Sequence, residues 1–374
     1  MIYTSYMQNI KNIPKRIKKY SIMRYTPLWS KQVIDGEIRS LAPLAPTLLG
    51  YRNKLITRDE YVKYYIQQLS KLNIEKVKEN LDNKVLLCTC MVGKTCHRHI
   101  LAKYLVNRGL EITEVMPPVR PNLFDIEVIK SYTPNSIEKY KDYTFVFGDN
   151  LIGKGKKGQA VIREYSNTYG IPTKRLPTMN DNAFFSDKED EIAIVKKKLE
   201  ILKISMLEGS KIVLPYDGIG TGLAKLETHS RYIFEYIREF IDNNFLSFHY
   251  ANKFKRRILV VGSRTYNNKR NIAKTIDGYI SDIKGRKNIL IISGGAKGVD
   301  SIAVEHSKSK EIETKTFEAN WTLYDKKAGF IRNTIMGDTC TEAIVFWDGK
   351  SKGTKNMINI LERMGKPYKL IKVK

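Results

Sequence analysis

The stretch that decides the fold lies in the last third of the chain, where residues 258–264 read ILVVGSR and residues 289–300 read ILIISGGAKGVD. Each is a run of branched apolar residues that ends in a glycine-containing turn, which is typical of a buried parallel strand leading into a helix. Segments of helical period separate such runs. We therefore predict a doubly wound parallel sheet covered by helices on both faces, with strands at about 258–262, 289–293, 312–317, 343–347 and 368–373.

The turns after these strands are candidate ligand sites, because open α/β sheets bind ligands at the carboxyl ends of their strands. Hydroxyl groups and backbone amides there are suited to hold a phosphate, and arginines to pair with it bidentately. The candidate ligand-binding residues of this third are Gly262, Ser263, Arg264, Gly294, Gly295, Asp300, Arg332, Asn333, Ser351, Gly353 and Thr354.

From Arg257 to Val373, with Trp321 ahead of an Ala-Gly…Arg-Asn motif, the chain resembles the SLOG superfamily and its YspA-like, YpsA-related branch. The resemblance implies a Rossmann-like nucleotide-binding domain. The superfamily includes nucleotide sensors, a single-stranded-DNA-binding recombination mediator and phosphoribohydrolases. The hydrolases carry a Gly-Thr-x-x-Glu motif, and Met357 stands here in place of the glutamate. Without that carboxylate no group stabilises an oxocarbenium-like transition state, so we expect this domain to bind rather than hydrolyse.

Two more glycine-rich loops follow predicted strands in the middle third. The strand at 143–147 leads into residues 149–160, DNLIGKGKKGQA, and the strand at 212–216 leads into residues 215–223, PYDGIGTGL. Glycines let the backbone approach an anion, and the lysines of the first loop supply positive charge. A solvated lysine loop is the alternative. The G-x-G-x-x-G pattern at residues 153–158 lacks the acidic residue that a dinucleotide fold requires about 20 residues later.

This pair of loops resembles those of macrodomain-like proteins, which clasp the diphosphate of ADP-ribose. The resemblance implies that the ligand would be lined by Asn150, Gly155, Gly158, Gly220, Thr221 and Gly222.

Three of the four cysteines lie in residues 88–99, CTCMVGKTCHRH, between a strand predicted at 85–88 and a helix at 97–107. Three interpretations stay open: a metal site, a reactive thiol and buried packing residues. The spacing lacks the paired Cys-x2-Cys of common zinc sites, so we assign no metal and no cofactor. The candidate catalytic residues are Cys90, Cys96, His97 and Arg98.

About residues 15–116 resemble domain-of-unknown-function family four-eight-eight. The resemblance rests on residues 21–24, 41–46 and 61–69 and on the cysteine segment up to Arg98. That family has no settled activity, and it adds Arg24 to the candidate ligand-binding residues.

Composition and charge limit the classes of function. The 374 residues are 42% hydrophobic and 28% charged, without an apolar run long enough to span a membrane, so we expect a cytoplasmic protein with no membrane partner. The net charge of +26 is uneven: residues 1–130 hold 22 Lys/Arg against 11 Asp/Glu, residues 131–250 hold 17 against 16, and residues 251–374 hold 26 against 12. Such a surface favours polyanions; the composition of an AT-rich genome is the alternative.

A proline-rich stretch at 116–121 and a basic one at 254–257 predict three α/β domains, at 1–120, 121–252 and 253–374. We expect a protein that recognises a nucleotide-derived ligand, such as an ADP-ribose-like or cyclic-nucleotide signal, in a setting of phage–host conflict. An enzyme acting on nucleotides or modified nucleobases, or a basic nucleic-acid-binding protein, is the alternative. A homo-oligomer is compatible with either.

Overall fold

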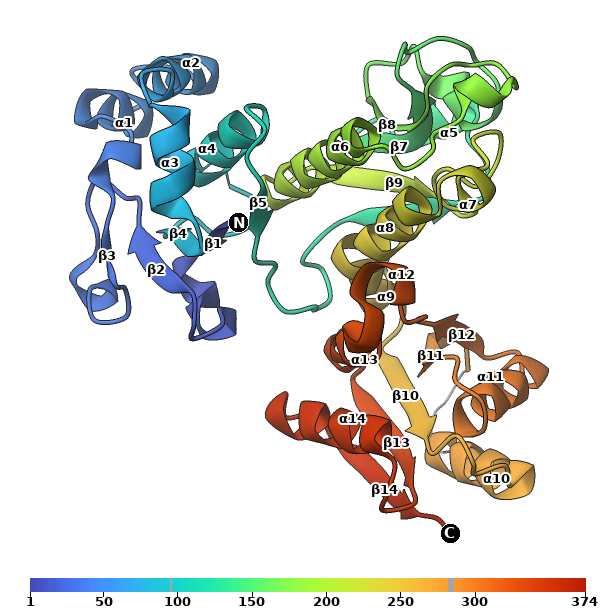
Figure 1. The fold of residues 1–374 in the computed structure, drawn as a ribbon. Helices are drawn as coiled ribbons and strands as arrows, with labels where there is room; N and C mark the ends of the chain where they lie inside the picture. The colour runs from blue at the N-terminus through green and yellow to red at the C-terminus, as the bar shows by residue number, and fades with distance from the viewer. Residues whose placement is uncertain (95, 282–285) are drawn as a thin grey trace. The chain divides into compact units, whose positions relative to one another are not determined.

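The computed structural model describes residues 1–94, 96–281 and 286–374; Thr95, in the cysteine segment, lies outside the described residues. The described residues form three sheets with helices packed against them (Figure 1), which confirms the predicted α/β class. They fall into two compact units. The first unit is residues 1–118 with 128–225, and the second is residues 119–127 with 226–374. The three domains proposed from the sequence stay a prediction.

The N-terminal sheet is parallel and lies in the first unit. Its strand order is β3 (Gly36–Glu37), β2 (Lys18–Ser21), β4 (Lys84–Cys88), β1 (Ile2–Tyr6) and β5 (Ile112–Glu114). The helices around it are α1 (Ala45–Arg52), α2 (Arg58–Leu69), α3 (Ile74–Leu81) and α4 (His97–Val106). The side chain of Thr57 accepts from the Glu60 N–H at the start of α2, and the Glu60 carboxylate accepts from the Thr57 N–H, which together form a capping box.

The middle sheet lies in the first unit, apart from the first two residues of its strand β6, and positions the two glycine-rich loops. Its order is β6 (Ile126–Ile129), β9 (Lys211–Pro215), β7 (Tyr143–Asn150) and β8 (Thr168–Lys174), accompanied by α5 (Pro134–Lys139) and α6 (Glu189–Leu207). Strand β7 is parallel to both β8 and β9, so the carboxyl ends of all three meet at one edge. Helix α6 also packs against α4, where Lys103 pairs with Glu208.

The sheet of the second unit is parallel throughout, and its order is that of the first five strands of a Rossmann fold. It runs β12 (Glu313–Thr316), β11 (Ile289–Ser293), β10 (Arg256–Gly262), β13 (Glu342–Trp347) and β14 (Tyr368–Lys372). Ile258 and Val260 belong to one hydrophobic core, and Leu259 and Val261 belong to another. Because successive side chains of a strand point to opposite faces, the two cores lie on the two faces of the sheet.

Helices of this unit fill both cores. The first core receives α10 (Lys269–Ile280) and α11 (Val299–Ser309), and the second receives α13 (Ala328–Thr339) and α14 (Lys352–Arg363). Met357 of α14 is 1% exposed and part of the second core. The residue that replaces the hydrolase glutamate is therefore a core residue.

Helices α7 (Leu226–His229) and α8 (Arg231–Ile241) follow the second glycine-rich loop and are continued by a π-helical turn and α9 (Ser247–Lys253). All of these belong to the second unit. There Lys315 pairs with Asp242 at 2.8 Å, and α8 packs against α12 (Trp321–Tyr324).

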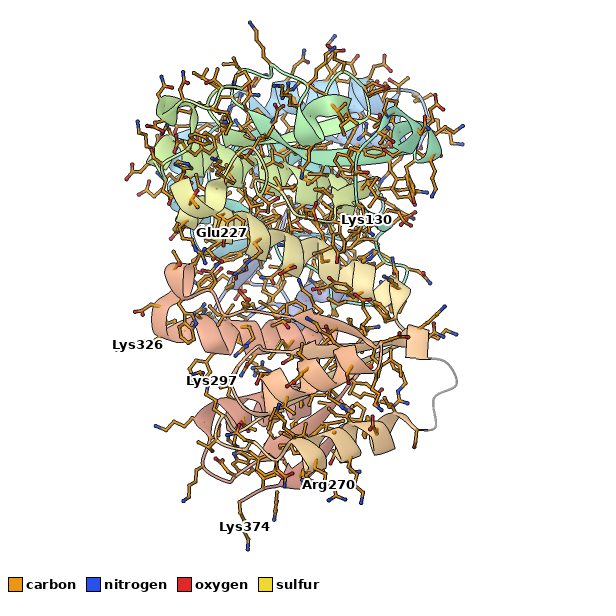
Figure 2. All side chains as sticks on the ribbon, turned by 90° about the vertical axis from the view of Figure 1, so that its right-hand side faces the viewer. Lys130, Glu227, Arg270, Lys297, Lys326 and Lys374 are labelled. Carbon is orange, nitrogen blue, oxygen red and sulfur yellow. The ribbon has the colours of Figure 1, made fainter. Side chains whose placement is uncertain are left out.

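Many basic side chains of the second unit extend from its surface, among them Arg270, Lys297, Lys326 and Lys374 (Figure 2). No helix of the described residues has the length and apolar character needed to cross a membrane.

Candidate functional site

A cavity of about 910 Å³ lies at the carboxyl ends of β7, β8 and β9. The first glycine-rich loop and the second both line it. All six residues assigned to the ligand from the sequence are brought together in its wall: Asn150, Gly155, Gly158, Gly220, Thr221 and Gly222. Their roles toward a ligand stay a prediction.

The loops approach each other closely where β7 ends. A Cβ atom on Gly148 would lie 3.5 Å from the backbone nitrogen of Gly220 and 3.3 Å from the Thr173 hydroxyl oxygen. Gly220 has a φ of +86°, a conformation that glycine adopts without strain. The Gln159 side chain joins the loops, since its amide group donates to the Gly218 carbonyl at 2.7 Å and accepts from the Gly148 N–H at 3.0 Å.

The backbone amides of the second loop are available to a ligand. Among the described residues, no protein group accepts a hydrogen bond from the N–H groups of residues 219–224, and Ile219, Gly220 and Ala224 are buried. Buried N–H groups are nearly always paired with a protein group, water or a ligand. Successive unpaired amides in a loop are a common form of anion-binding site, and an anion-binding role for these stays a prediction.

Six cationic residues line the cavity, and Lys174, the last residue of β8, is the most buried of them, 6% exposed. Its ammonium group donates to the Leu223 carbonyl at 3.1 Å and lies 4.1 Å from the centre of the Phe184 ring. Among the described residues no carboxylate pairs with it. Burial, together with repulsion from Lys225, lowers the pKa of Lys174. Arg163, by contrast, pairs with Asp149 and donates to the Gly155 carbonyl.

Three of these residues escaped the sequence prediction. Lys174 and Thr173 lie on β8, whose residues Thr168–Lys174 mix polar and apolar side chains and were not recognised as a strand. Gln159 resembled any other polar loop residue. Asn150 was predicted and shapes the first loop, because its amide donates to the Lys154 carbonyl at 2.7 Å.

In the second unit the predicted site residues meet where the strand order reverses, between β10 and β13. The Ser263 hydroxyl accepts from the Asp348 N–H at 3.2 Å and so ties the two turns together. Ser351 caps α14 by accepting from the Thr354 N–H.

Some of the candidate ligand-binding residues form hydrogen bonds with one another, as Asp300 and Arg332 do with Gly294. The Asp300 carboxylate accepts from the N–H groups of Gly262 (3.3 Å) and Gly294 (3.1 Å), and burial raises its pKa to about 6 even though Arg332 is near. Arg332 donates to the carbonyls of Gly294 and Phe317.

Asn333, Gly295 and Arg264, three further candidate ligand-binding residues of this unit, differ in their contacts and exposure. Asn333 donates to the Asn356 side chain at 3.0 Å, and Gly295 has a φ of +69° that suits its turn. Arg264 is exposed at the same edge of the sheet.

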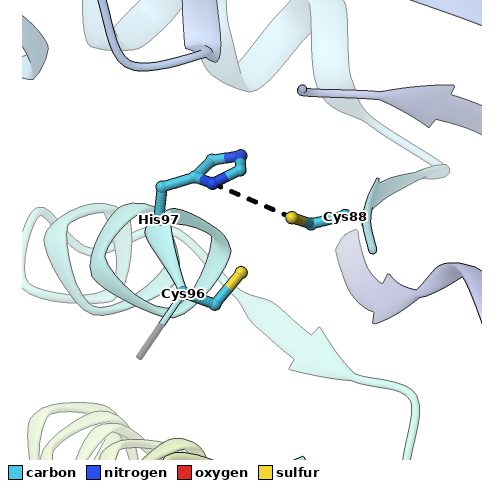
Figure 3. A group of neighbouring side chains, drawn as sticks. All are labelled: Cys88, Cys96 and His97. Carbon is cyan, nitrogen blue, oxygen red and sulfur yellow. Dashed lines mark hydrogen bonds between the residues drawn. The ribbon is translucent and has the colours of Figure 1, made fainter. Parts of the chain in front are cut away.

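The cysteine segment forms a cluster between β4 and α4 (Figure 3). Cys88 ends β4, Cys96 precedes α4 and His97 is its first residue, and all three are buried. The Cys88 sulfur lies 3.6 Å from the Cys90 sulfur and 3.8 Å from the Nδ1 atom of His97. Hydrogen bonds from Cys90 and Cys96 lower the pKa of the Cys88 thiol, and the pKa of Cys90 is raised to about 11, chiefly by its bond to Cys88.

Arg24 and Arg98, the two arginine candidates of the N-terminal third, bond to other groups of the protein. Arg98 is fully buried, pairs with Glu114 at 3.1 Å and donates to the Cys90 carbonyl at 3.3 Å. Although burial opposes its charge, attraction to Glu114 raises the pKa of Arg98. Arg24 donates to the Pro43 carbonyl at 2.9 Å and the Ala42 carbonyl at 3.1 Å. These contacts are structural, and a catalytic or ligand role for either residue stays a prediction.

Comparison with known proteins finds two families. Residues 256–324 match the YspA, cpYpsA-related SLOG family, which confirms the predicted resemblance over that segment. Residues 127–240 match a family of unknown function (DUF7831), which names no ligand, so the macrodomain resemblance stays a prediction. No curated protein matches the chain.

Two solved structures of DNA processing protein A are similar in part. The protein from Streptococcus pneumoniae is 19% identical, with a TM-score of 0.28, over 33% of this chain and 52% of that one. The protein from Helicobacter pylori, described for its single-stranded DNA binding mode, is 16% identical, with a TM-score of 0.27, over 32% and 67%. This chain thus spans about half the length of the first.

Proposed function

We propose that the cavity between the two glycine-rich loops binds a phosphate-bearing, nucleotide-derived ligand, such as ADP-ribose or a cyclic nucleotide. The observation that carries the proposal is Lys174, a buried cation in the cavity wall that no carboxylate of the described residues neutralises. A buried charge is costly unless it is paired. A phosphate placed beside Lys174 would supply the missing partner.

The free amides of residues 219–224 support the same ligand chemistry. Phosphate oxygens accept several hydrogen bonds at once, and a run of N–H groups in a loop is a common way to provide them. The cavity, at about 910 Å³, is within the range of about 300–1,000 Å³ that small-molecule sites occupy. It therefore has room for a base and ribose besides the phosphates.

The second unit supports a nucleotide-related role on separate grounds, through its SLOG match at residues 256–324. Its switch-point turns, which carry Arg264 and Ser351, would hold a ligand of related chemistry. The cavity and the turns of the second unit are tested separately, because the cavity residues all lie in the first unit and their substitution leaves the sequence of the second unit unchanged.

Isothermal titration of the full chain with ADP-ribose, ATP, AMP and cyclic nucleotides tests the cavity. Gly222 lines it, has no positive φ, and a Cβ atom there meets nothing within 4 Å, so Gly222→Leu fills the cavity without strain. Gly278 in α10 is equally unobstructed and lies outside the cavity, so Gly278→Leu is the matched control. We expect at least one compound to bind, with affinity reduced at least about tenfold, or 1.4 kcal/mol, in Gly222→Leu and unchanged in the control. Absence of saturable binding, or binding that Gly222→Leu leaves intact, overturns the proposal.

A further inference from the structure

We propose that Cys88, Cys90, Cys96 and His97 form a Cys3His site for a zinc ion, distinct from the ligand cavity. The sulfur atoms of Cys88 and Cys96 and a ring nitrogen of His97 all lie within 4.8 Å of one another, and all three residues are buried (Figure 3). The residues come from the end of β4 and the start of α4, so their closeness arises from the fold and not from a single turn.

The spacing of these atoms fits tetrahedral zinc. With Zn–S bonds of about 2.3 Å and Zn–N bonds of about 2.0–2.1 Å, ligand atoms at tetrahedral angles are about 3.5–3.8 Å apart. The Cys88 sulfur lies 3.6 Å from the Cys90 sulfur and 3.8 Å from the His97 Nδ1 atom. The pairs Cys88–Cys90 and Cys88–His97 are thus at separations expected of two ligands of one zinc ion, and the Cys96 sulfur lies within 4.8 Å of the ligand atoms of Cys88 and His97.

A hydrogen bond on the far side of its ring holds His97 with Nδ1 toward Cys88. Its Nε2 atom lies 2.8 Å from the Ile22 carbonyl oxygen. A carbonyl only accepts, so Nε2 carries a hydrogen, and Nδ1, which faces Cys88, is the ring nitrogen available to a metal. A backbone carbonyl that fixes the far nitrogen in this way is the usual outer partner of a zinc-bound histidine.

Cys90 would serve as the fourth ligand: its sulfur lies 3.6 Å from that of Cys88 but outside the group of atoms that are all within 4.8 Å of one another, so its side chain must move to reach a shared ion. It is half-buried, and its carbonyl oxygen accepts from Arg98, whose own position is fixed by the buried pair with Glu114. Four protein ligands leave no open position for a substrate, which is typical of a structural site. The ion would fasten the segment after β4 to the beginning of α4.

The test measures metal in the full chain, purified under reducing conditions, by mass spectrometry and by Co²⁺ substitution. Tetrahedral Co²⁺ bound to thiolates absorbs strongly in the visible and near ultraviolet. We expect one zinc ion per chain, a Co²⁺ spectrum of this type, and at least about tenfold weaker metal binding in Cys88→Ser, Cys96→Ser and His97→Asn. The matched controls are Cys340→Ala, a buried cysteine far along the chain, and His306→Asn, and both keep the metal.

A second measurement needs no variant and covers the case in which a ligand substitution prevents folding. Cys90 is the one of the three cysteines that is not fully buried, and added Zn²⁺ should slow its alkylation by iodoacetamide at least about tenfold, as mapped by peptide mass spectrometry. The proposal fails if the reduced protein neither contains nor takes up Zn²⁺, if Cys88→Ser leaves the Co²⁺ spectrum unchanged, or if Zn²⁺ does not protect Cys90.

Discussion

Three buried charged side chains, Arg98, Asp300 and Lys174, differ in the partners that the protein gives them. Arg98 is matched by Glu114, and the attraction between them outweighs the cost of burial. Asp300 is near Arg332, yet burial still dominates and its pKa is raised to about 6. The ammonium group of Lys174 contacts a carbonyl, the Met179 sulfur and an aromatic ring, and none of the described carboxylates pairs with it. The protein therefore stabilises the charge of Arg98 and disfavours that of Asp300, and our proposal assigns the partner of Lys174 to a ligand.

Removing Arg98 should destabilise the first unit strongly, because Glu114 would be left charged and unpaired in the interior. Both side chains are fully buried, so we expect Arg98→Met to lower the free energy of unfolding by about 3–5 kcal/mol, measured by urea denaturation. The double variant with Glu114→Leu should recover at least half of this loss. A loss below about 1 kcal/mol in the single variant would show that the pair is not buried in solution.

Replacing Lys174 should separate binding from stability. Lys174→Met keeps the length of the side chain and removes a buried charge that has no carboxylate partner, so we expect the melting temperature without ligand to be unchanged or higher. The affinity for the nucleotide ligand should fall at least about tenfold, or 1.4 kcal/mol. Titration calorimetry and differential scanning fluorimetry measure the two effects, and a variant that still binds normally contradicts the role given to Lys174.

Asp300 should make the stability of the second unit depend on pH. Its pKa rises from an ordinary value near 3.9 to about 6 on folding, so the folded state binds the proton more tightly. The resulting stabilisation is complete below about pH 4 and is lost as the pH rises through 6, a change of about 3 kcal/mol. Urea unfolding between pH 4 and 7 should show this loss in the wild type and not in Asp300→Asn. Parallel profiles for the two proteins would refute it.

At the scale of elements, the strand-to-helix turns of the second unit depend on glycine where two backbones meet. Gly298, which precedes α11, has a φ of +79°, and a Cβ atom there would lie 2.5 Å from the carbonyl oxygen of Arg264 in the turn after β10. The turns after β10 and β11 can approach each other only because this side chain is absent.

Gly298→Ala should therefore destabilise the second unit by more than about 1 kcal/mol, since both the backbone conformation and the contact with Arg264 become unfavourable. Gly278→Ala, in open space within α10, should instead stabilise it by about 0.5–1 kcal/mol through helix propensity. Thermal unfolding of both variants gives the comparison. Equal effects of the two substitutions would be incompatible with the turn geometry.

At the scale of the whole molecule, the net charge of +26 attracts polyanions whether or not the cavity binds a ligand. The excess of basic residues lies in residues 1–130 and 251–374, and residues 131–250, which hold most of the cavity wall, are close to neutral. Most of the excess positive charge is thus carried by residues outside the cavity wall, and where it is exposed salt screens its attraction to polyanions.

We expect weak, sequence-independent binding of duplex DNA that falls about 10³-fold or more between 50 and 200 mM salt if six or more phosphates are contacted. Gly222→Leu should leave this binding unchanged. Fluorescence anisotropy at several salt concentrations makes the measurement. Salt-resistant binding that depends on DNA sequence would favour the nucleic-acid-binding alternative over the nucleotide proposal.

The sequence by itself determined the parts of the fold that depend on local pattern. The buried strands β10, β11 and β13 and their glycine turns follow from apolar runs and from the lack of a side chain at fixed positions. The two loops of the cavity were predicted on the same basis. Strand β1 was not, because Thr4 and Ser5 look like surface residues. They are buried only because Thr4 bonds to Glu114 and Ser5 to the Val115 carbonyl, 110 positions away.

Only the tertiary structure decided what each polar side chain faces. Arg98 was a candidate catalytic residue, yet its side chain is fully buried and pairs with Glu114. Lys174, at the end of an unrecognised strand, lies in the cavity wall. The closeness of Cys88 to His97 likewise depends on how β4 and α4 pack. The physical reason is that apolar periodicity is a property of neighbouring residues, whereas the burial of a charge or a thiol depends on partners that distant segments bring to it.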